Sequence, residues 1–158
     1  MRLVLLVLLA CAATACGNQG KKVGAGIPPN LTDTTDRKAC SGAADPNTKI
    51  TSHSWHFRQS TPEFSLLTTY KFDDTSVTVT NNCSWSTGVS LSVDLTLPAQ
   101  VGTSQVTIRM AGQKQTDQDV GNLHYKCEVA QQARAFTFGF VGKCLSLQDG
   151  INIKVLVP

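Results

Sequence analysis

Apolar and polar side chains alternate in short runs from residue 50 to the end of the chain, and turn residues separate the runs. In the clearest run, residues 89–97, every odd-numbered position is Val or Leu and every even-numbered position is Ser, Asp or Thr. A period of two is typical of a β-strand with one buried face and one face in water. The same alternation recurs in residues 54–58, 64–72, 76–80, 106–110, 123–129, 134–140, 144–147 and 151–157.

The pattern predicts an all-β domain of eight or nine strands. An amphipathic helix needs apolar residues at i, i+3, i+4 and i+7, and no stretch of residues 17–158 sustains this spacing. Because the connections are short, we expect a small antiparallel up-and-down barrel, whose closure removes exposed strand edges. A two-sheet β-sandwich is the alternative. Residues 111–120 (AGQKQTDQDV) are polar and without a pattern, so we expect a long loop there.

Residues 1–16 (MRLVLLVLLACAATAC) have the parts of an export signal: a positive charge at Arg2, an unbroken run of Leu and Val, and small residues before Cys16. The apolar run is shorter than the about 20 residues of a transmembrane helix. The ending ATAC resembles the lipobox of bacterial lipoproteins, with Ala13 where that family usually has Leu. The resemblance implies cleavage before Cys16 and its modification by lipid, both diacylglycerol and an acyl chain such as palmitate. Cys11 is a second candidate, and an ordinary secretory signal is the alternative.

Three segments follow from this interpretation. Residues 1–15 are the predicted lipoprotein signal peptide, and residues 40–158 form one β domain. Residues 16–39 are rich in Gly, Pro, Asn and Thr and lack periodicity, so we expect a flexible tether carrying the lipid. The expected location is the bacterial cell envelope, held to the membrane through Cys16. Gly17 after the cysteine resembles the outer-membrane-sorted type, so we expect the outer rather than the inner membrane.

The remaining cysteines are Cys40, Cys83, Cys127 and Cys144, an even number that predicts two disulfides in an exported chain. Alternation places Cys83 and Cys127 on inward faces of their strands. Cys144 has the parity opposite to its apolar neighbours, and Cys40 lies on the segment entering the domain. We therefore predict the pairs Cys83–Cys127 and Cys40–Cys144.

The charges and motifs favour a non-catalytic protein. The 14 Lys and Arg residues and 11 Asp and Glu residues are interspersed, which is not typical of a nucleic-acid-binding surface. The chain has no linear motif of a serine hydrolase, zinc protease or phosphate-binding loop. His53 and His56 would point to opposite faces of a strand, so they do not predict a metal site. We expect no enzyme activity, no metal and no cofactor.

Five aromatic residues on inward-facing positions are the candidate ligand-binding residues: Trp55, Tyr70, Phe136, Phe138 and Phe140. Aromatic side chains of this kind either line the cavity of a small barrel or fill a solid core. The first arrangement predicts a binding module for a small hydrophobic ligand. The second favours a protein-facing inhibitor or a structural envelope component. In that second case Trp85, which follows Cys83 in a loop-like stretch, is the candidate for an exposed protein contact.

Residues 50–158 resemble the small lipocalin-like domains of bacterial lipoproteins. The resemblance rests on Trp55 in the first strand, on the hairpin of residues 70–79 (YKFDDTSVTV) and on the closing strands with the Asp-Gly turn at residues 149–150. The glycine expected two places before the tryptophan is His53 here. The resemblance implies a small barrel that encloses one apolar molecule.

The predicted anchor can be tested by replacing Cys16 with Ser. Without the thiol no lipid can be attached, so the variant should not incorporate a labelled lipid precursor. It should also either leave the membrane fraction or keep its signal peptide. Metabolic labelling and membrane fractionation measure both. A C16S chain that still behaves as a mature lipoprotein would move the lipid site to Cys11.

Overall fold

The computed structural model describes residues 22–158, so the predicted signal peptide and Cys16 lie outside the described residues. The described chain is all-β, with 63% of its residues in strands and 4% in helix, as the alternation predicted. No helix within residues 22–158 is long and apolar enough to cross a membrane. The strands are β1 (Val23–Ala25), β2 (Thr32–Asp33), β3 (Ser54–Thr61), β4 (Phe64–Phe72), β5 (Ser76–Trp85), β6 (Ser90–Val101), β7 (Gln105–Ile108), β8 (Gly112–Val120), β9 (Leu123–Gln131), β10 (Arg134–Val141), β11 (Cys144–Asp149) and β12 (Asn152–Leu156), with short 3-10 helices at Lys38–Cys40 and Ile50–Ser52.

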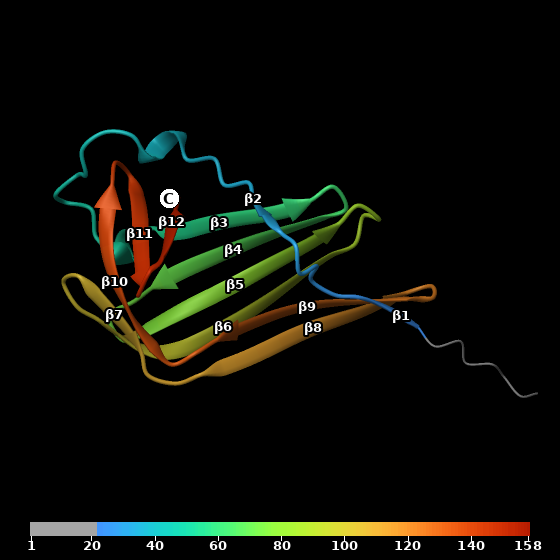
Figure 1. Cartoon of the computed structure of the whole chain (residues 1–158). Helices are drawn as coiled ribbons and strands as arrows, with labels where there is room; N and C mark the ends of the chain where they lie inside the picture. The colour runs from blue at the N-terminus through green and yellow to red at the C-terminus, as the bar shows by residue number, and fades with distance from the viewer. Residues whose placement is uncertain (1–21) are drawn as a thin grey trace, which may run out of the picture.

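Nine strands form one antiparallel sheet in the order β12-β11-β10-β7-β6-β5-β4-β3-β2. The sheet curls strongly into a half-barrel (Figure 1). Its two ends approach each other at a single bridge, where His56 of β3 and Val157 exchange two backbone hydrogen bonds of 2.7 and 3.0 Å. The predicted antiparallel, barrel-like architecture is therefore confirmed.

The hairpin β8–β9 leaves the main sheet and pairs with β1 in a second, three-stranded sheet. This sheet packs on β5 and β6, and the Cys83–Cys127 disulfide joins β5 to β9. Residues 112–120 form the strand β8, so the prediction of a long loop over residues 111–120 is wrong. Both faces of β8 are largely exposed, so its sequence carries no alternation although its backbone pairs fully with β9.

The core lies on the concave face of the half-barrel. Alternation places every second side chain of β3, β4, β5 and β9 on the inward face. The fully buried residues, each 0% exposed, include Trp55, Val77, Val106, Leu145 and Leu156. The Trp55 indole N–H donates a 2.7 Å hydrogen bond to the carbonyl oxygen of Ile50, which satisfies its polar atom.

The structure differs from the expected flexible tether over the described part of residues 16–39. β1 pairs in parallel with β9, and β2 pairs with β3. Ile27 and Leu31 pack against the core. Composition missed this docking because backbone pairing with a strand edge needs no apolar periodicity. We call residues 32–40, which run from β2 to Cys40, the strap.

The structure contains both predicted disulfides. The Cα atoms of Cys83 and Cys127 are 5.8 Å apart, and those of Cys40 and Cys144 are 5.0 Å apart, both within the normal range. Gly142 allows the strap to come this close. Its φ is +56°, and a Cβ there would lie 2.5 Å from the carbonyl oxygen of Ser41.

The Cys40–Cys144 disulfide should stabilise the domain through the unfolded state. It spans 104 residues, so the double variant C40A/C144A should lose about 4–5 kcal/mol of unfolding free energy by the chain-entropy estimate. Urea unfolding measures the change. The control is C83A/C127A, which opens a loop of 44 residues and should lose about 4 kcal/mol. Only the first variant should also speed hydrogen exchange of the strap amides. Unchanged strap exchange in C40A/C144A would show that the disulfide does not hold the strap.

Candidate functional site

The candidate site is a cavity of about 280 Å³ at the rim of the half-barrel, where β4, β10, β11 and β12 come together. Its lining combines apolar and charged side chains, and it is formed by Tyr70, Arg134, Phe136, Leu147, Asp149, Asn152, Ile153 and Lys154. This volume lies near the lower end of the range for small-molecule sites. The cavity therefore suits one small molecule.

The floor of the cavity is apolar because three strands point their inward side chains at it. Tyr70 on β4 and Leu147 on β11 are buried, and Phe136 on β10 is half-buried. The ring of Tyr70 stacks with that of Phe72 at a centroid distance of 6.2 Å. These contacts fix the orientation of the Tyr70 ring, so the floor is preformed.

Lys154 places a cation over this floor. It shares the inward face of β12 with the buried Leu156, and its Nζ lies 4.8 Å from the ring centroid of Phe57 and 5.8 Å from that of Tyr70. The ring faces attract the ammonium electrostatically. Within residues 22–158, no carboxylate lies within ion-pair distance of the Lys154 ammonium. Its charge is thus available to a bound anion.

Arg134 forms the opposite part of the rim and is held from two sides. Its guanidinium lies 4.6 Å from the ring centroid of Phe136 and donates a 2.7 Å hydrogen bond to the carboxylate of Asp149. Because Asp149 neutralises this guanidinium, Lys154 is the cation left to recognise negative charge. Arg134 instead lies over the Phe136 ring as part of the cavity lining.

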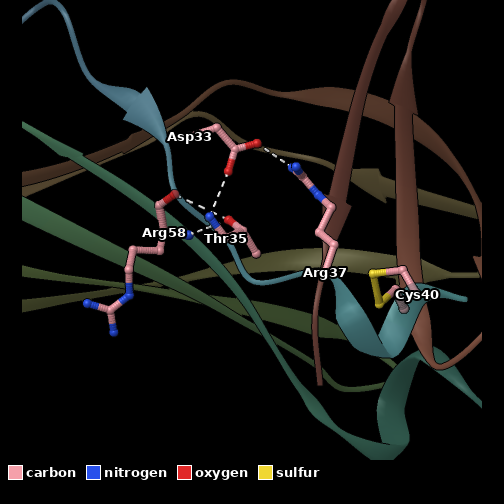
Figure 2. A network of polar contacts seen from close by, with 6 residues as sticks. Asp33, Thr35, Arg37, Cys40 and Arg58 are labelled. Carbon is pink, nitrogen blue, oxygen red and sulfur yellow. Dashed lines mark hydrogen bonds and ion pairs between the residues drawn. A yellow bond between two sulfur atoms is a disulfide. The ribbon is translucent and has the colours of Figure 1, made fainter.

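The strap occupies part of the hydrogen-bonding edge of β3 (Figure 2). Strand β2 pairs with Gln59 and Ser60 of β3, and next to it Thr35 Oγ1 accepts a 2.9 Å hydrogen bond from the backbone N–H of Arg58. The edge of β3 is therefore occupied at residues 58–60, and β12 reaches β3 only through the bridge at His56. The wall of the half-barrel stays open along Asn152 and Lys154.

Asp33 organises the strap (Figure 2). Its carboxylate accepts hydrogen bonds from the backbone N–H of Thr35, at 3.0 Å, and from the guanidinium of Arg37. Partial burial raises the pKa of this carboxyl, but the bonds from Thr35 and Arg37 lower it more, so the pKa of Asp33 lies below its ordinary value. The folded strap therefore favours the ionised form.

The structure divides the five aromatic residues that the sequence singled out. Tyr70 and Phe136 line the rim cavity. Phe138 and Phe140 line a different cavity of about 290 Å³, together with Ile50 and Val101. Trp55 is fully buried in the core and contacts Phe140 at a centroid distance of 5.8 Å. The five aromatic residues therefore do not line one common cavity: two line the rim cavity, two line another, and Trp55 lines neither.

Sequence reasoning missed Lys154. In residues 151–157 the odd positions are all Ile or Val, which suggested a buried face there, yet Ile151 is 96% exposed and Ile153 is 64% exposed. The inward face is the even one, with Lys154 and Leu156. A pattern of alternation gives two faces but does not say which one points inward, and a lysine between apolar residues gave no signal of a site.

Trp85, His53 and His56 all make contacts within the fold. Trp85 ends β5 half-buried, with ring centroids 5.1 Å from both Phe64 and Tyr125, so it is not the freely exposed aromatic that was expected. His53 contacts the edge of the Trp55 ring, and His56 Nδ1 lies 2.9 Å from Thr69 Oγ1. Among the described residues no group of three or more metal-ligating side chains comes together.

Comparison with known proteins gives no relative: no family model, curated protein or solved structure matches this chain. The function must therefore be argued from the site itself.

The strap should loosen in acid. Since the pKa of Asp33 is lowered in the folded state, the stability that its ionised form contributes is present above the ordinary carboxyl pKa and is lost as the pH falls through the folded pKa. We expect D33N to lose about 1 kcal/mol at pH 7 and to respond less than the parent between pH 5 and about pH 3. Urea unfolding and hydrogen exchange of the strap measure this. The control is D36N, because Asp36 is more exposed and its hydrogen bond and ion pair are both with Lys38. Equal pH responses of D33N and the parent would contradict the role of Asp33.

Proposed function

We propose that this chain is a lipid-anchored lipoprotein of the bacterial cell envelope whose β domain is a non-catalytic binding module for a small hydrophobic ligand. The lipobox-like ending at Cys16 supports the anchor, and the residue that follows it favours the outer membrane. The observation that carries the binding function is the rim cavity, which joins a preformed aromatic floor to an unpaired ammonium. The ligand class that matches this lining has a small apolar body and one negative charge.

The inward position of Lys154 favours a ligand site over a gap in the packing of the core, because the ammonium lacks an anionic partner there among the described residues. A lysine on the inward face of a strand loses hydration, and the ring faces of Phe57 and Tyr70 compensate only part of this loss. An anion that enters between the ammonium and the apolar floor would complete its coordination. A charge-assisted hydrogen bond of this kind contributes about 1.5–3 kcal/mol, which corresponds to about 10–100-fold in affinity.

A protein-facing role is the second candidate, and exposed apolar side chains favour it. Ile151 and Ile153 project from the β11–β12 hairpin next to the cavity entrance. Exposed apolar side chains that lie together on a hairpin are typical of a contact surface. In this version the β domain is an inhibitor or structural envelope component, and the hairpin rather than the cavity is the contact.

Two probes that differ only in charge separate these possibilities. Octanoate and octanol carry the same apolar chain, and calorimetric or NMR titration measures their binding. We expect K154M, which keeps the apolar stem but removes the charge, to weaken octanoate binding about ten-fold and to leave octanol binding unchanged. The control variant is K143M, because Lys143 is exposed in the turn between β10 and β11. Native mass spectrometry of the domain purified from its host should show a small retained anion. No saturable binding of either probe to the parent chain would instead favour the contact surface.

A further inference from the structure

The free end of the three-stranded sheet carries a row of apolar side chains. Val23 of β1 pairs with Leu123 of β9, and Leu123 pairs with Val120 of β8. Side chains of laterally paired residues point to the same face of a sheet, so these three form one continuous row. Val23 is 65% exposed, Val120 is 44% exposed and Leu123 is half-buried. We call this row the tip row.

The tip row extends beyond the part of the second sheet that the main sheet covers. Tyr125, the next residue on the same face of β9, still contacts Trp85 of β5, and its hydroxyl donates to Thr87 at 3.0 Å. Two residues farther out, the hairpin projects past the ends of the neighbouring strands (Figure 1). The tip row is therefore an uncovered apolar surface on a projecting hairpin.

The opposite face of the same end is polar and internally neutralised. Lys22 pairs with the carboxylate of Asp119, and His124 Nδ1 lies 2.7 Å from the other oxygen of that carboxylate. The hydrogen bonds from Lys22 and His124 keep the pKa of Asp119 below its ordinary value. The Val23 N–H also donates to the carbonyl of Asn122 at 3.1 Å. These contacts fix β1 to the hairpin and make this end amphipathic.

The length of chain between this end and the predicted lipid limits where the end can lie. Only residues 17–21 separate Cys16 from Lys22, and a chain of this length spans at most about 20 Å when fully extended. The longest strand, β6, has 12 residues and is about 40 Å long. Lys22 is therefore within about 20 Å of the predicted lipid. Because this distance is shorter than β6, the end formed by β1, β9 and β8 lies nearest to the bilayer.

We propose that the tip row docks on the bilayer that holds Cys16, with Val23, Val120 and Leu123 at the boundary between head groups and acyl chains. The inference rests on the proposed lipid anchor and adds an orientation to it. The partner is a lipid surface because an apolar row with a neutralised polar back fits the interfacial region. The rim cavity lies at the other end of the molecule (Figure 1), so this docking directs its entrance away from the membrane.

Tryptophan quenching by lipid tests the orientation on the full lipid-modified chain. V120W places a reporter in the tip row, and I151W places the same reporter in an exposed hairpin turn near the rim cavity. Each is reconstituted into phosphatidylcholine and phosphatidylglycerol vesicles, with and without brominated acyl chains, and the emission of the parent chain is subtracted. We expect a blue shift and a loss of emission with brominated lipid for V120W and neither change for I151W.

Each outcome decides the proposal. Equal quenching of the two reporters, or quenching of I151W alone, overturns the docking while the lipid anchor stands. A chain that does not float with the vesicles overturns the anchor and the docking together, and mass spectrometry of Cys16 identifies this case.

If V120W fails to fold, hydrogen exchange of residues 119–124 in the parent is the substitute. Slower exchange there on vesicles than in detergent supports the docking, and an unchanged rate overturns it. Adding V23D should abolish the quenching of V120W without releasing the chain from vesicles.

Discussion

The hydrogen-bonding edge of β3 is the constraint on which the rest of this structure depends. Two segments from opposite ends of the chain share it: the strap pairs along residues 58–60, and Val157 pairs at His56. If β12 paired along the whole of β3, the sheet would close into a complete barrel without a lateral opening. If the strap were absent, the backbone groups at residues 58–60 would lack partners. The half-barrel, its open rim and the cavity there all follow from this division of one edge.

The shared edge also explains the charge inside the rim cavity. β12 pairs with β11 along its length but meets β3 only at the Val157 bridge. Its inward residue Lys154 therefore lies beside an opening and not in the sealed core. An ammonium in the sealed core would need a carboxylate partner. At the opening, the ring faces of Phe57 and Tyr70 hold it, and solvent or a ligand can reach it. A lysine in place of Leu156, which is 0% exposed, would have neither solvent nor a carboxylate partner within the described fold and would destabilise it.

The sequence predicted those features that depend on side-chain parity within long strands. The all-β class, the inward face of β6 and the Cys83–Cys127 pair follow from alternation, because strands paired over many residues cannot slip without exposing their apolar face. The Cys40–Cys144 pair forms as predicted, although parity suggested an outward Cys144 and this residue is 0% exposed. Features made by backbone pairing were missed. β8 has two exposed faces, and β1 and β2 are too short to show a period. In the site, Tyr70 and Phe136 were found by parity, whereas Lys154 was missed since parity alone does not say which face of an edge strand is inside.

The bridge between His56 and Val157 has a consequence for the order in which the chain can fold. The partner of His56 is Val157, which is synthesised after β12, and the cysteine that fixes the strap lies in β11. During synthesis, β3 to β9 can therefore assemble while the edge of β3 still has no permanent partner. An unpaired strand edge recruits other chains. The chain is consequently most prone to aggregate in the interval before Val157 emerges, and loss of Val157 would leave the edge at His56 unpaired.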